Sequence, residues 1–215
     1  ASSMANNVIV LQQGSAGGNI VIGSRGIRKY RLIVETKPRD LRPGIKAHDA
    51  LRWTNLKIEA MMRLSSQKDR VGVFIAGINA KHFPMMLPHR VQVNLLLSYY
   101  KSATANKAED DIRGILGKKD PKWRLNMVSD RPEMVARREN RAFYNKIREI
   151  AEKLEIPIAH ATSATPSAAG LVPRGVAVVC GLGPIVDAQH TPLEAVQRVS
   201  LFQRTILLAE ILRLT

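Results

Sequence analysis

Few residues of this chain have the types and spacing that metal binding or catalysis requires. No His-x-x-x-His pair, the spacing with which one helix face holds zinc, occurs among the histidines His48, His82, His89, His160 and His190. The single cysteine, Cys180, follows Val178 and Val179, so no internal disulfide can form and a buried, inert thiol in a reducing compartment is expected. One cysteine and scattered histidines predict no Cys-His or Ser-His-Asp arrangement for nucleophilic catalysis.

Basic residues are better candidates, because phosphate groups need only cations in register with their backbone. Four cations and an indole occur within seven residues: Lys118, Lys119, Lys122, Trp123 and Arg124. A second group, on a predicted helix, comprises Arg137, Arg138 and Arg141. Solvated surface would explain each group equally well. Aromatic residues make up 5% of the chain and no RNA-recognition or zinc-knuckle motif occurs, so binding would be to the nucleic-acid backbone.

The distribution of charge is unusual. The chain has 33 lysine and arginine residues against 18 acidic residues, a net charge of +15 and a pI near 10.4. Residues 1–130 carry 22 basic and 10 acidic side chains, whereas residues 131–215 carry 11 and 8. A field of this sign attracts polyanions or acidic protein surfaces and does not determine the fold. We therefore expect an acidic partner, either RNA or a protein assembly, with a merely well-solvated surface as the alternative.

The elements that would position these residues follow from the hydrophobic periodicity. Strands of alternating apolar residues are predicted around residues 30–34, 71–75, 91–97 and 123–127. In the first, Tyr30, Leu32 and Val34 face one way and Lys29 and Arg31 the other. Amphipathic helices are predicted over residues 47–64 and 103–116. The order β-α-β-β-α-β predicts an α+β fold with a ferredoxin-like domain over residues 20–128.

The segments on either side of this domain predict a partial α/β domain. Residues 1–19 contain a short apolar strand, 8–11, that enters a glycine-rich loop. Residues 129–215 predict a helix near 143–154 and strands over 156–159 and 175–181. Thr191, Pro192 and Glu194 have the spacing of a capping box, so a closing helix should begin there. That helix is expected to bury Phe202, Ile206, Ala209 and Leu212.

Length and hydropathy set the class of protein. A chain of 215 residues with 45% apolar content can bury a core in one or two domains. No window reaches the roughly 18 apolar residues of a membrane span, and the N-terminus lacks the pattern of a signal peptide. We expect a soluble protein without a membrane partner.

Three segments resemble the zinc aminoacylases and carboxypeptidases, including the glutamate carboxypeptidase and desuccinylase kind. The run Gln12-Gln13-Gly14-Ser15-Ala16-Gly17 resembles the Glu-Glu-Gly-Ser-x-Gly segment of that family, and Gly44 to His48 resembles the start of its first lid helix. The third segment is Gly181-Leu182-Gly183-Pro184 followed by His190, Thr191 and Glu194. The resemblance implies a lid domain and a C-terminal catalytic segment. It does not cover the first half of the family.

The resemblance also implies a degenerate metal site. The paired glutamates, which are the general base and a zinc ligand of the family, are the amides Gln12 and Gln13, which can neither take a proton nor supply negative charge. The substrate-binding arginine that the family has in its lid corresponds to Ser98 here. An aspartate of the family corresponds to Pro166 or a neighbouring residue. Of the site residues of the family, only His48 and His190 are still recognisable, and His190 corresponds to the terminal zinc ligand. The alternative is that both are ordinary residues at a helix start or in a loop. No cofactor is expected, unless another chain completes a zinc site.

Three functions remain open. The first is a non-catalytic, basic structural or binding component derived from the exopeptidase fold, within a larger and possibly RNA-containing assembly. The second is the C-terminal portion of an active zinc-dependent enzyme that a separate N-terminal half completes. The third is a regulatory protein that forms a homodimer through its lid. We favour the first, because the missing carboxylates and the charge both point to it.

Overall fold

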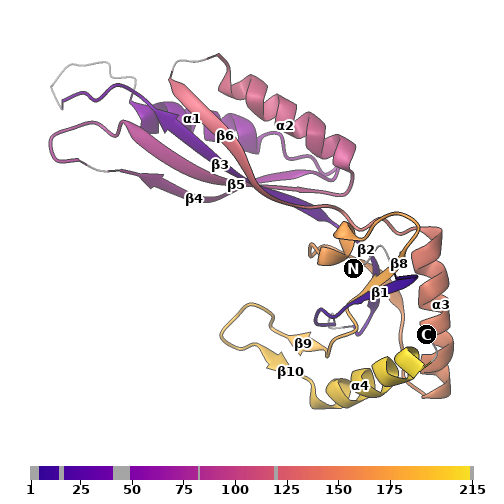
Figure 1. Cartoon of the computed structure of the whole chain (residues 1–215). Coiled ribbons are helices and arrows are strands. Elements are labelled where there is room, and N and C mark those ends of the chain that lie inside the picture. The colour runs from indigo at the N-terminus through magenta and orange to yellow at the C-terminus, as the bar shows by residue number, and fades with distance from the viewer. Residues whose placement is uncertain (1–4, 15–16, 41–48, 82, 119–120, 214–215) are drawn as a thin grey trace. The chain divides into compact units, whose positions relative to one another are not determined.

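The computed structural model describes residues 5–14, 17–40, 49–81, 83–118 and 121–213. The chain forms two compact units (Figure 1). Gly26–Arg131 is the insert unit, and Ala1–Arg25 together with Pro132–Thr215 is the terminal unit. The sequence placed the first boundary at residue 20. The structure places it later, because residues 20–24 form a buried strand of the terminal unit.

The insert unit has the predicted β-α-β-β-α-β order. It comprises β3 (Gly26–Glu35), α1 (Ala50–Met62), β4 (Gly72–Ala80), β5 (Arg90–Tyr99), α2 (Ser102–Leu116) and β6 (Lys122–Arg131). The sheet order is β4-β5-β3-β6, with every neighbouring pair antiparallel. This is the α+β, ferredoxin-like arrangement that the sequence predicts.

Side-chain alternation decides which face of this sheet is covered. Tyr30, Leu32 and Val34 are buried with residues of α1 and α2, whereas Lys29 and Arg31 are exposed, as predicted. Helix α1 begins after Asp49, whose carboxylate accepts a 2.7 Å hydrogen bond from the backbone N–H of Arg52. The two helices therefore lie on one face of the sheet, and the opposite face carries the charged residues.

The terminal unit is built around a second four-stranded sheet. Its strands are β1 (Asn7–Val10), β2 (Ile20–Ser24), β7 (His160–Ser163) and β8 (Ala177–Cys180), in the order β1-β8-β2-β7. β1 is parallel to β8, β2 is parallel to β7, and β2 is antiparallel to β8. The remaining elements are α3 (Arg138–Lys153), a 3-10 turn η2 (Ala168–Leu171), a hairpin of β9 (Val186–Asp187) and β10 (Ala195–Val196), and α4 (Arg198–Arg213).

Two local predictions for the terminal unit are wrong. The strand expected over 156–159 lies at His160–Ser163, because Ile156 packs into the core and its N–H donates to Ala151 O at the end of α3. The residues of the predicted capping box form a turn, but neither reciprocal bond of a capping box and no helix. Thr191 Oγ1 accepts from Leu193 N and Glu194 Oε2 accepts from His190 N, at 3.2 and 2.8 Å. The chain then pairs β10 with β9, and α4 begins only at Arg198.

The buried face of α4 also differs from the prediction. Ser200, Arg204, Leu207 and Ile211 are buried, whereas Phe202, Ile206 and Leu212 are 63%, 52% and 63% exposed and Ala209 is exposed. Apolar residues lie on several sides of this helix, so periodicity alone could not choose between them. The observed packing lets the buried guanidinium of Arg204 donate to Gly18 O. Among the described helices, none has the length and apolar character to cross a bilayer.

Candidate functional site

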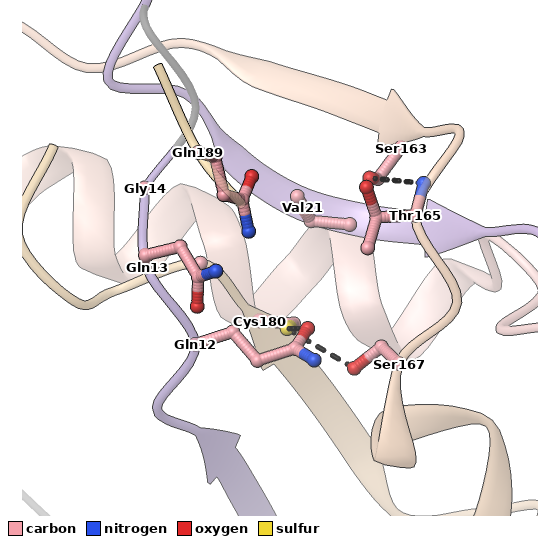
Figure 2. Close-up of a pocket in the computed structure, with 10 residues that line it drawn as sticks. Gln12, Gln13, Gly14, Val21, Ser163, Thr165, Ser167, Cys180 and Gln189 are labelled. Atoms are coloured by element: carbon pink, nitrogen blue, oxygen red, sulfur yellow. Dashed lines mark hydrogen bonds between the residues drawn. The ribbon is translucent and has the colours of Figure 1, made fainter. Parts of the chain in front are cut away.

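Polar side chains from four separate segments of the terminal unit line one small pocket (Figure 2). Its volume is about 70 Å³. The loop after β1 contributes Gln12 and Gln13, and the loops after β7 and β9 contribute hydroxyls and an amide. The lining residues are Gln12, Gln13, Gly14, Val21, Ser163, Thr165, Ser167, Cys180, Gly181 and Gln189. The structure therefore joins the glutamine pair to the segment in which the resemblance places a lost aspartate.

Close backbone contact holds the two glycine motifs together. Gly183 N donates to Gln12 O, and Gly14 N donates to Pro184 O, both over 2.8 Å. A Cβ added at Gly183 would lie 2.5 Å from Gln12 O, so no larger residue fits at that position without a shift of the backbone. The two motifs that the sequence singled out at opposite ends of the chain are thus neighbours.

The floor of the pocket is a buried thiol. Cys180, which is 1% exposed, accepts a hydrogen bond from Ser167 Oγ over 3.1 Å and donates one to Gln12 Oε1 over 2.9 Å. Burial raises the pKa of Cys180 above its ordinary value, and the hydrogen bonds from Ser167 and from the backbone offset only part of that rise. The thiol therefore keeps its proton at neutral pH and is a poor nucleophile and metal ligand.

The residues that line the pocket do not fit a zinc ion. Zinc in proteins is held by thiolates, imidazoles and carboxylates, whereas this pocket offers amides, hydroxyls and a protonated thiol. His190 is exposed, has a φ of 64° and is not among the lining residues. Across the described ranges, no three His, Cys, Asp or Glu side chains gather where they could share a metal ion. His48 lies outside the described residues.

Three of the four basic residues in the first predicted group, Lys118, Lys122 and Arg124, line a second, larger depression. Its volume is about 780 Å³, and it lies at the β6 edge of the insert unit. It is lined by Ile33, Glu35, Gly117, Lys118, Lys122, Trp123 and Arg124. The Trp123 Nε1–H donates to Gly117 O over 3.1 Å, and an Arg124 nitrogen lies 3.7 Å from Glu35 Oε2. Lys119 lies outside the described residues.

The second predicted group does not line this depression. Arg137, Arg138 and Arg141 belong to the terminal unit, at and just before the start of α3. Arg138 and Arg141 are exposed, and Arg137 Nη1 donates to Pro173 O over 3.1 Å. The structure therefore divides the predicted cations between two units.

Sequence reasoning missed a charged network inside the insert unit. Arg28 is 8% exposed, and its Nε lies 3.2 Å from Asp130 Oδ2 while its Nη1 lies 3.6 Å from Glu109 Oε2. Tyr30 donates to the same Glu109 oxygen. Arg28 shares the period-two pattern of Tyr30, Leu32 and Val34, so its inward direction could have been read from the sequence.

Ser98, the predicted counterpart of the lid arginine, is 8% exposed on β5.

Neither a protein-family model nor a curated protein matches the sequence. Solved structures do. An aminopeptidase PepT from Bacillus cereus superimposes with a TM-score of 0.73 at 16% identity, over 98% of this chain and 58% of the aminopeptidase. An amidase of the hydantoinase/carbamoylase family from Burkholderia vietnamiensis has a TM-score of 0.69 at 14% identity, over 93% of this chain and 52% of the amidase.

These similarities agree with the fold that the sequence resemblance implies. At such low identity they establish the fold alone. The chain spans a little more than half the length of the structures it matches. It therefore has the fold of one part of these amidase and aminopeptidase structures.

Proposed function

We propose that this chain is a non-catalytic, basic binding component that has kept the fold of a zinc exopeptidase and serves within a larger, RNA-containing assembly. The observation that carries the first half of this proposal is the neutral lining of the small pocket. Gln12 and Gln13 lie where the resemblance expects carboxylates, and the neighbouring thiol is protonated. Neither an amide nor such a thiol can act as a general base at neutral pH.

The distribution of charge supports the second part of the proposal, a role in an RNA-containing assembly. The insert unit carries 22 basic against 10 acidic residues, so most of the net charge lies in one compact unit. Three of its cations, Lys118, Lys122 and Arg124, line the same depression. Such a surface favours phosphate groups without regard to sequence.

Two measurements on the 215-residue chain test the proposal. The first is zinc content and hydrolysis of N-acylated amino acids and dipeptides after incubation with zinc. We expect neither stoichiometric zinc nor turnover, because the pocket supplies no anionic ligand. Zinc-dependent turnover that a chelator abolishes would contradict the proposal.

The second measurement is the salt dependence of binding to a single-stranded RNA. If about five cations meet phosphates, log affinity should fall with log salt at a slope of roughly −3.5. Replacing Lys118, Lys122 and Arg124 by alanine should make the slope shallower by about 2. Replacing Arg137, Arg138 and Arg141 by alanine removes the same charge from the terminal unit. Comparing the two triple variants shows which group of cations contacts the RNA. If RNA does not bind even at low salt, the RNA part of the proposal is wrong.

One observation favours a second candidate. The solved structures extend over nearly twice the length of this chain, which suits a zinc-dependent amidohydrolase or peptidase completed by further sequence or by a separate chain. In that case the chain would gain tight zinc binding once the complementary part is supplied. A zinc titration of the chain with its co-purified partners distinguishes this candidate from the first.

A further inference from the structure

The face of the insert-unit sheet opposite α1 and α2 has an organised surface. Paired residues of neighbouring strands share a face, so the register defines rows across β4, β5, β3 and β6. One row reads Phe74, Leu96, Lys29 and Ser129, and the next reads Gly77, Asn94, Arg31 and Asn126. The third row reads Asn79, Gln92, Ile33 and Arg124, and the fourth is Arg90, Glu35 and Lys122. We call this surface the open face.

Cations outnumber carboxylates on the open face. Lys29, Arg31, Arg90, Lys122 and Arg124 are all exposed. Among the paired residues of the four rows, Glu35 is the acidic one, and it contacts Arg90 and Arg124 at 3.5 and 3.7 Å. This carboxylate therefore pairs with two guanidinium groups while the face as a whole stays positive.

Amides occupy the middle rows, between the cations. Asn94 and Asn126 flank Arg31, and Gln92 flanks Ile33. Asn94 and Asn126 are exposed, and Gln92 is partly exposed. An amide supplies both a donor and an acceptor, which is what the edges of unpaired bases and ribose hydroxyls require.

One aromatic ring completes the face. Phe74 on β4 is 50% exposed, and its ring lies against Gly72, where an added Cβ would come within 2.7 Å of Cε2. Because Gly72 has no side chain, the ring of Phe74 can pack directly against its backbone. A ring held in this way beside Leu96, in the same row as Lys29, can stack with a base of any identity.

We infer that the open face binds single-stranded RNA, which enters from the depression at the β6 edge and crosses the sheet toward Phe74. The depression and the open face share Ile33, Glu35, Lys122 and Arg124, so the two surfaces are continuous. Cations for phosphates, amides for base edges and a ring for stacking are the three components with which flat sheets recognise unpaired RNA. An acidic protein would use the cations but has no need of the exposed ring. This inference rests on the proposed RNA-binding role and assigns it a surface.

The test compares two double variants that remove the same charge from the insert unit. Lys29→Ala with Arg31→Ala alters the open face, and Arg52→Ala with Lys107→Ala alters the exposed sides of α1 and α2. The probe is a fluorescent 12-nucleotide oligouridine, titrated at several salt concentrations. The open-face variant should bind about tenfold more weakly near 0.1 M salt, with a slope shallower by about 1.4, because about 0.7 is lost per phosphate contact. The helix variant should bind like the unsubstituted chain.

The ring supplies a readout that does not depend on charge. Phe74→Ala should weaken binding about fivefold or more without changing the salt slope, and Phe74→Tyr should restore it. If RNA binds but the two double variants weaken it equally, the open face is not the site, although an RNA-binding role would stand. If the oligouridine does not bind, both proposals fail. If polyglutamate competes fully and Phe74→Ala has no effect, the surface serves an acidic protein and the inference is wrong.

Discussion

The thiol of Cys180 donates a hydrogen bond to Gln12 Oε1 over 2.9 Å, and this contact joins the end of β8 to the loop after β1. The acceptor is the oxygen of a neutral amide, so this partly buried contact carries no net charge. Burial raises the pKa of this thiol, the only sulfhydryl of the chain, so it keeps its proton at neutral pH. The pocket therefore contains no reactive thiolate, because burial keeps its thiol protonated.

Reaction with a thiol reagent should reveal this state directly. Because only the thiolate reacts and burial raises the pKa of Cys180, the native chain at pH 8 should react at least about tenfold more slowly than the chain in urea. Cys180→Ser gives the background, since the sequence has no other cysteine. Rapid modification of the native chain would contradict the buried, protonated thiol.

Stability at low pH should depend on Glu109. Burial opposes its ionisation, but hydrogen bonds from Tyr30 and Arg113 outweigh burial and hold the pKa of Glu109 below its ordinary value of 4.5. A lowered folded-state pKa stabilises the fold above the unfolded-state pKa, and this contribution is lost as the pH falls through the folded-state value. Glu109→Gln should cost about 2 kcal/mol at pH 7. The difference should shrink below about pH 4.5.

The control for this experiment is Asp110→Asn, which removes the exposed neighbouring carboxylate. Urea unfolding of the three chains between pH 3 and 7 gives the comparison. A constant difference between the unsubstituted chain and Glu109→Gln over that range would contradict the charged hydrogen-bond network.

Asn140 should be the most sensitive polar residue of the terminal unit. Its Nδ2 donates to Ile22 O and Val135 O, and its Oδ1 accepts from Val178 N over 2.9 Å. Asn140→Ala leaves these buried backbone groups without their partner and should cost about 3 kcal/mol or more. Asn145→Ala, on the exposed side of the same helix, should cost less than about 1 kcal/mol. Chemical denaturation measures both.

The packing of α4 can be tested by two truncations. Leu207 is fully buried, so Leu207→Ala should destabilise the chain by about 2 to 5 kcal/mol. Phe202 is 63% exposed, and Phe202→Ala should change the free energy of unfolding by about 0.5 kcal/mol or less. If Phe202→Ala destabilised the chain more than Leu207→Ala, α4 would bury the face that periodicity predicts, and the observed packing would be wrong.

The sequence by itself determined the fold of the insert unit and the distribution of charge. Its strands alternate with period two and its helices with period 3.6, and both signals are local because each residue faces the core or solvent through its own backbone geometry. In the terminal unit the corresponding signals are ambiguous. α4 is apolar on several sides, and Thr191 Oγ1 accepts a hydrogen bond within an isolated turn where the sequence predicts the start of a helix.

Only the tertiary structure decided what the candidate sites contain. It set Gln12 against Cys180 and Gly183 across more than 160 residues, and it buried Arg28 beside Glu109. It also aligned Phe74, Asn94 and Arg31 on one face, through the pairing of strands that are distant in the sequence. Such contacts depend on the register between strands and on the fit of whole elements, and no local pattern in the chain encodes either.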